Sequence, residues 1–157
     1  MRKLALATIL SLMIPQALAQ QSKSECTFEA CKAGTKAITY FQKSDPYYAC
    51  PNRELATYLT TVMGLVSIQA MIGVMPNISD KTGEPEYTGE TKILVDGLRE
   101  QAQVQSFDEA VKICALGSAK RRVTILNMPE NSMVAYVLDE GRKQTFWMPI
   151  AHLDKVR

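Results

Sequence analysis

Residues 122–152 read RVTILNMPENSMVAYVLDEGRKQTFWMPIAH, and this stretch decides the fold class. Its apolar side chains alternate with polar ones, which is typical of strands that bury one face. The segment 139–142 (Asp-Glu-Gly-Arg) is typical of a hairpin turn, and the Pro-containing segment 129–132 makes a second connection. The pattern therefore predicts a small antiparallel meander. We expect its three strands at Arg122 to Met128, Met133 to Leu138 and Lys143 to His152.

The third strand places large side chains on both of its faces. Phe146 and Met148 point to one face, whereas Trp147 and Pro149 point to the other. Proline cannot donate to a ladder, so this strand is expected either to bend at Pro149 or to lie at an edge, where it could accept a partner strand. The ending from Trp147 to Leu153 resembles the closing strand of an SH3-like barrel. Either Phe146 or Trp147 must face solvent unless a helix covers the second face, which makes the pair a candidate binding surface.

The N-terminal half is predicted to be helical. Ser22 and Glu25 have the spacing of a capping box, and apolar residues follow at intervals of three to four up to about Phe41. A second helix is predicted from Pro51 to about Met75, because proline suits the first helical position and Glu54 suits the first turn.

The second helix is apolar on most sides. No charged residue occurs between Leu55 and Ser79, so this helix is either buried in a core or a membrane span. Three of the four cysteines precede it and Cys114 follows it. If all four are paired, both flanks share one oxidising compartment, which favours the buried helix.

The chain after this helix returns to a shorter helical pattern. Residues 79–90 are predicted to be a loop and a domain boundary, and Thr91 to about Gln103 a short helix with Ile93, Leu94 and Leu98 on one side. Ser106 and Glu109 form a second capping box, opening a helix that ends at Gly117 in a left-handed cap. The predicted fold is α+β, with disulfide-braced N-terminal helices (20–78) followed by a helix and an antiparallel sheet (91–157).

The first 19 residues have the pattern of a secretory signal peptide. Met1-Arg2-Lys3 is basic, Leu4 to Ile14 is almost wholly apolar, and Ala17-Leu18-Ala19 is a cleavage box. Removing this leader removes two of the 18 basic residues. The remaining basic residues then equal the 16 acidic residues in number. A neutral mature chain gives no argument for nucleic acid or an anionic membrane surface. We expect a periplasmic or secreted protein, cleaved near Ala19.

The cysteines are expected to form two disulfides. An even number in an exported chain favours this arrangement, and no Cys-x-x-Cys motif is present. Cys26 and Cys31 are five residues apart and should not pair within a regular helix, so each is expected to find a distant partner. Cys114 is expected to bridge from the helix after Ser106 to one of the other three. The four cysteines are Cys26, Cys31, Cys50 and Cys114.

The sequence carries no specific catalytic signature, and we predict no catalytic residue, cofactor or metal site. The single histidine, His152, would have to serve Ser132 or Ser118 in any hydrolase, with Asp154 or Asp139 to orient it, and no motif supports this. A small cell-wall hydrolase with two working carboxylates is the alternative enzyme. Its candidate pairs are Asp108 with Glu109, Glu84 with Glu86, and Asp139 with Glu140.

Aromatic residues supply the candidate partner-binding positions. Tyr47 and Tyr48 lie beside Cys50, and Phe146 and Trp147 lie on the third strand. We therefore expect a non-enzymatic exported protein that binds a protein in the cell envelope. It would be an accessory or adaptor subunit of a secretion or conjugation assembly, or an inhibitor or immunity protein. A single-span membrane-anchored subunit is the third alternative.

Overall fold

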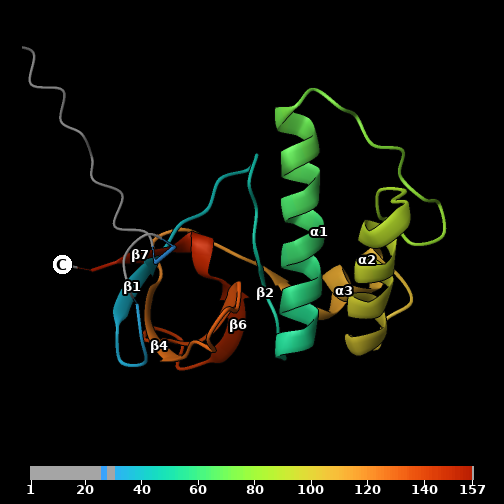
Figure 1. Ribbon diagram of the computed structural model, residues 1–157. Helices are drawn as coiled ribbons and strands as arrows, with labels where there is room; N and C mark the ends of the chain where they lie inside the picture. The colour runs from blue at the N-terminus through green and yellow to red at the C-terminus, as the bar shows by residue number, and fades with distance from the viewer. Residues whose placement is uncertain (1–25, 28–30, 157) are drawn as a thin grey trace, which may run out of the picture.

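The computed structural model describes residues 26–27 and 31–156, which form an α+β fold (Figure 1). The predicted leader and the Ser22–Glu25 capping box lie outside these residues. The elements are β1 (Lys36–Thr39), β2 (Tyr48–Ala49), α1 (Arg53–Met71), α2 (Gly89–Gln101), α3 (Phe107–Ile113), β3 (Ala115–Leu116), β4 (Arg122–Asn127), β5 (Val134–Asp139), β6 (Thr145–Pro149), a 3-10 turn η1 (Ile150–His152) and β7 (Leu153–Lys155).

The five longer strands form one antiparallel sheet in the order β6-β5-β4-β1-β7. The first strand of the sequence thus lies between the fourth and the last, with Ala37 opposite both Val123 and Lys155. All three described helices belong to the connection between β1 and β4. The three predicted C-terminal strands are confirmed, although the third ends at Pro149 and the chain continues through η1 into β7.

The predicted helix up to Phe41 is wrong in its described part, because residues 36–39 form β1. Ala37 and Thr39 are buried and Lys36 is exposed, so this short segment has the alternation of a strand in the middle of a sheet. The helices are therefore not N-terminal to the sheet as expected.

Helix α1 has a buried half and an exposed half. The first helical residue is Arg53 rather than Pro51, and the N-cap Asn52 accepts a side-chain hydrogen bond of 2.9 Å from the Leu55 amide. The buried residues all precede Gly64, whereas Ile68 and Met71 near its C-terminal end are exposed. The prediction of a buried helix holds only for the first half. Within the described residues, no helix is both long and apolar enough to cross a membrane.

The predicted positions of α2 and α3 are nearly right. The buried face of α2 and the C-terminal end of α3 differ from the prediction. In α2, Val95 is buried while Ile93 and Leu94 are exposed, so the predicted apolar face is wrong. Ser106 caps α3 by accepting from the Glu109 amide, as predicted, but α3 ends at Ile113. Gly117 follows β3 and does not adopt a left-handed conformation.

Two disulfides join the four cysteines. Cys50 pairs with Cys114, so the predicted bridge from the helix after Ser106 is confirmed. Cys26 pairs with Cys31, which contradicts the expectation that each would find a distant partner. The expectation rested on a regular helix through both residues, and Cys31 instead precedes a turn that leads into β1.

The core consists of two apolar clusters, one on each side of β6. One lies inside the sheet and includes Val137, Phe146 and Met148. The other lies among the helices and includes Tyr58 and Leu59 of α1. Figure 1 shows α1 standing between the sheet and the pair formed by α2 and α3.

Candidate functional site

The predicted partner-binding aromatics are distributed between the two clusters. Tyr47 and Phe146 are buried, with exposed fractions of 2% and 7%, so both rings belong mainly to the core. Tyr48 and Trp147 are half-buried and pack against the cluster formed by the helices. Of the four positions, Tyr48 and Trp147 keep a partly accessible side chain.

The conflict between Phe146 and Trp147 is resolved by helical cover. Phe146 points into the sheet cluster, and Trp147 points toward the helical cluster, where its ring lies 5.3 Å from that of Tyr136. The backbone of Trp147 also exchanges two hydrogen bonds with Cys50, of 2.8 and 2.9 Å. β6 is a terminal strand of the sheet, as expected, and Cys50 pairs with the centre of its outer edge.

His152 is a buried, bonded residue. Its Nδ1 lies 3.1 Å from the carbonyl oxygen of Tyr40, and its ring lies 5.1 Å from the ring of Tyr47. Its Nε2 is 3.8 Å from a carboxylate oxygen of Asp45. The Ser132 hydroxyl donates to the Val134 carbonyl and accepts from the Val134 amide, and the backbone of Ser118 bonds with the Tyr47 hydroxyl.

A groove opens where α1 meets η1 and the segment before β2, and we call it the junction groove. It has a volume of about 230 Å³. One wall is the α1 face with Leu59, Met63 and Gly64, and the opposite wall contains Tyr47 and His152. Asp45 lies at its rim with a side chain that is 55% exposed. The groove therefore combines apolar walls with a single carboxylate.

The end of α1 and the segment after it form a second distinctive surface, which we call the apolar tip. Met71 and Met75 are 80% and 89% exposed, although both are large apolar residues. In Figure 1 this end of α1 lies away from β2 and α3. No charged residue interrupts the sequence between Leu55 and Ser79. The members of the apolar tip are Ile68, Met71, Ile72, Val74, Met75 and Ile78.

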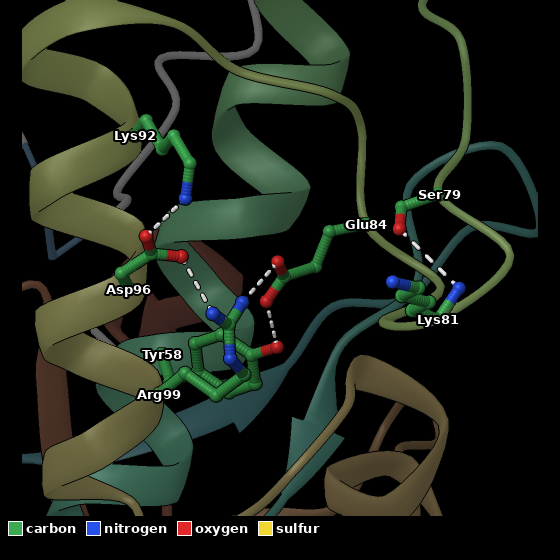
Figure 2. A network of polar contacts seen from close by, with 7 residues as sticks. All are labelled: Tyr58, Ser79, Lys81, Glu84, Lys92, Asp96 and Arg99. Carbon is green, nitrogen blue, oxygen red and sulfur yellow. Dashed lines mark hydrogen bonds and ion pairs between the residues drawn. The ribbon is translucent and has the colours of Figure 1, made fainter.

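A polar network fixes the loop that precedes α2 (Figure 2). Glu84 is buried, and its carboxylate accepts hydrogen bonds from the Tyr58 hydroxyl and, over 2.5 Å, from the Arg99 guanidinium. Arg99 also bonds with Asp96 over 2.5 Å, and Asp96 pairs with Lys92. Within the predicted loop at 79–90, Glu84 joins this segment to α1 and α2.

The network changes the acidity of its members. Burial, followed by the hydrogen bond to Glu84, raises the pKa of Tyr58 above its ordinary value. Burial and the charge of Glu84 raise the pKa of Tyr87 to about 12. Hydrogen bonds from Lys92 and Arg99 lower the pKa of Asp96. Burial opposes the charge of Arg99, but its bonds to the two carboxylates outweigh this effect and raise its pKa.

The other carboxylate pairs also have structural partners. One oxygen of Asp139 accepts from the amides of Gly141 and Arg142, at 2.9 and 3.0 Å. Glu140 accepts from the Thr124 hydroxyl, and Glu109 accepts from the Gln105 amide at the start of α3. The described residues contain no group of three or more His, Cys, Asp or Glu side chains placed to hold a metal ion.

No protein family, curated protein or solved structure matches this chain. Its function must therefore be argued from its own surfaces.

Sequence reasoning missed both surfaces and the network. The absence of charge from Leu55 to Ser79 indicated burial of the whole α1 helix, whereas its C-terminal half is the exposed part. Asp45 and His152 are far apart in the sequence and only the sheet order brings them together. The single useful signal was the presence of Tyr47 and Tyr48 beside Cys50, since both tyrosines line the junction groove.

Proposed function

We propose that this chain is an exported, non-enzymatic binding protein that uses the apolar tip to bind a protein of the cell envelope. It would act as an accessory or adaptor subunit of an assembly such as a secretion or conjugation apparatus, or as an inhibitor or immunity protein. The observation that carries this proposal is the exposure of six large apolar residues on one uncharged segment.

Exposed apolar residues scattered singly need no explanation, but a contiguous set marks an interaction surface. Methionine side chains adapt to irregular surfaces, and the apolar tip contains two of them. A charged or strongly polar ligand would gain nothing from such a surface. A protein with a complementary apolar face is therefore the partner that its chemistry favours.

Export is supported by the leader pattern and is compatible with the two disulfides. We also infer that the sheet is of the SH3-like kind. Its last strand lies beside its first and is reached through a 3-10 turn, which is the arrangement that the resemblance of the C-terminal segment implies. SH3-like barrels host many unrelated functions, so this inference concerns the fold and the proposed function rests on the apolar tip.

The proposal is tested by photo-crosslinking from the apolar tip in the native host. A photoreactive amino acid replaces Met71 in one variant and Lys112, an exposed residue on α3, in a matched control. We expect one dominant envelope protein to be captured from position 71 and not from position 112. Adding Ile68→Glu to the Met71 variant should abolish capture without unfolding the chain, because Ile68 is already exposed.

Two results would contradict the proposal. Equal capture from both positions would show that the apolar tip is not a specific contact. Capture that survives Ile68→Glu, in a variant whose circular dichroism is unchanged, would show that apolar contact does not carry the binding.

A further inference from the structure

The junction groove is built from three separate parts of the sequence. The face of α1 with Leu59, Met63 and Gly64 forms one wall, and Pro149 and His152 close the other side. Gly64 leaves this wall open, since a Cβ built there would meet no atom within 4 Å. The segment before β2 brings Asp45 to the rim, where its amide is held by a 3.1 Å hydrogen bond to the Gln42 carbonyl.

The size of the groove restricts its occupant. Pockets that take a cofactor or drug-sized molecule usually exceed about 300 Å³. The junction groove, at about 230 Å³, suits one long side chain of a partner protein. The backbone of the partner protein would stay outside the groove and only its side chain would enter, so no wide opening is needed.

The charge of the groove restricts the occupant further. Among the described residues that line it, Asp45 is the only acidic or basic residue besides His152. The 3.8 Å separation between Asp45 and His152 Nε2 is too long for a hydrogen bond, so the half-exposed carboxylate can accept one from a ligand. The walls below it offer the half-buried Tyr48 side chain and the thioether of Met63, which suit an aliphatic stem and a neighbouring cation.

We propose that the junction groove binds a lysine or arginine side chain presented by the partner protein, with the stem against Met63 and the charged head on Asp45. This inference rests on the proposed function, because it names the chemistry of the partner. Lysine and arginine bury their methylene stems against apolar surfaces while the charged head stays near water, as the groove allows.

The test uses the purified, disulfide-bonded protein and three capped pentapeptides that differ only in a central lysine, norleucine or glutamate. We expect the lysine peptide to give saturable amide shifts in two-dimensional NMR spectra at Thr60, Gly64 and Ser67, which line the groove. The norleucine peptide should bind about five-fold more weakly, which corresponds to about 1 kcal/mol for one exposed ion pair. The glutamate peptide should give no saturable shifts.

Two variants and one control separate the charge from the shape of the groove. Asp45→Asn should reduce lysine-peptide affinity about five-fold, whereas Asp80→Asn, at an exposed position outside the groove, should leave it unchanged. Gly64→Leu should block binding by filling the groove, and its circular dichroism should match that of the parent because a Cβ at this position meets no atom within 4 Å.

Equal binding of the lysine and norleucine peptides, or shifts confined to residues outside the groove, would overturn the inference. Capture of a partner from position 71 without lysine-peptide binding would overturn this inference alone. Lysine-peptide binding without capture would support the groove and overturn the apolar tip as the contact.

Discussion

The backbone of Gly117 lies against the ring of Tyr47. A Cβ at residue 117 would stand 2.4 Å from the ring atoms Cε2 and Cζ, closer than any real contact. The Gly117 amide donates to the Tyr47 carbonyl over 2.8 Å, and the Tyr47 hydroxyl donates to the Ser118 carbonyl over 2.9 Å. Tyr47 is thereby held through both its carbonyl and its hydroxyl, and it lines the junction groove.

Gly117→Ala is expected to destabilise the protein by about 1–3 kcal/mol, since the added methyl forces the buried ring to move. Urea denaturation measures this loss as a lower midpoint. Gly64→Ala is the matched control, because its Cβ meets open space and alanine favours a helix by about 1 kcal/mol over glycine. If both substitutions shift the midpoint in the same direction, the close contact at Gly117 does not determine stability.

The two disulfides should contribute unequally to stability. Cys50–Cys114 spans 64 residues and Cys26–Cys31 spans five. The chain-entropy argument then predicts losses of about 4 and 2 kcal/mol when each pair is replaced by serine. Urea denaturation of the two double variants, without reductant, tests this order. A larger loss from the shorter bridge would mean that chain entropy is not the main contribution.

Glu84 and Arg99 should behave as a coupled pair. Glu84→Gln and Arg99→Met are each expected to lower the free energy of unfolding by about 2 kcal/mol. Each substitution removes one member of the ion pair and leaves the charge of the other member unpaired and largely buried. The double variant should lose less than the two single losses together, which a double-mutant cycle measures. Lys92→Met, at an exposed pair with Asp96, should change stability by less than about 0.5 kcal/mol. Additive losses would indicate that the pair is not coupled.

Alkaline pH should weaken the fold through its buried phenols. The pKa of Tyr87 is raised to about 12 and that of Tyr58 is also raised, so both stay protonated in the folded protein. Such groups stabilise the fold fully below the ordinary phenol pKa of about 10, and this contribution is lost as the pH rises toward the folded value. We expect the free energy of unfolding to fall between about pH 10 and 12. Tyr87→Phe should make that fall shallower, and an unchanged slope would contradict the assignment.

The two halves of α1 should differ in amide hydrogen exchange. Leu55 to Val62 contribute buried side chains, whereas Gly64 to Met71 contribute few. Local opening is easiest where few apolar contacts hold a helix, so the second half should exchange faster. Uniform protection along the helix would show that the apolar tip is more firmly held than its exposure indicates.

Some of the fold follows from local sequence. The alternation of apolar and polar side chains in residues 122–152 predicts β4, β5 and β6, because each strand buries one face and pairs with a strand nearby in the sequence. Ser106 predicts the start of α3 because a cap depends only on residues three positions away. β1 is different, since Lys36–Thr39 fits a helical spacing equally well and its neighbours β4 and β7 lie far along the chain.

The candidate site was less predictable than the fold. The sequence shows that Phe146 and Trp147 point to opposite faces of the same strand. It does not show that α1 covers the face that bears Trp147. Glu84 lies in a polar loop of the sequence, and only the folded chain places Tyr58 and Arg99 beside it. Burial of a charge depends on distant partners, and nothing in the local sequence indicates them.

The position of β1 between β4 and β7 also sets an order in time. A chain that emerges from its N-terminus delivers β1 early, yet both neighbours of that strand belong to its final part. Pairings between distant segments form slowly, because a long loop must close first. The helices between them can assemble while the sheet is still incomplete. The pairing of β1 with both neighbours is therefore complete only after β7 has been synthesised.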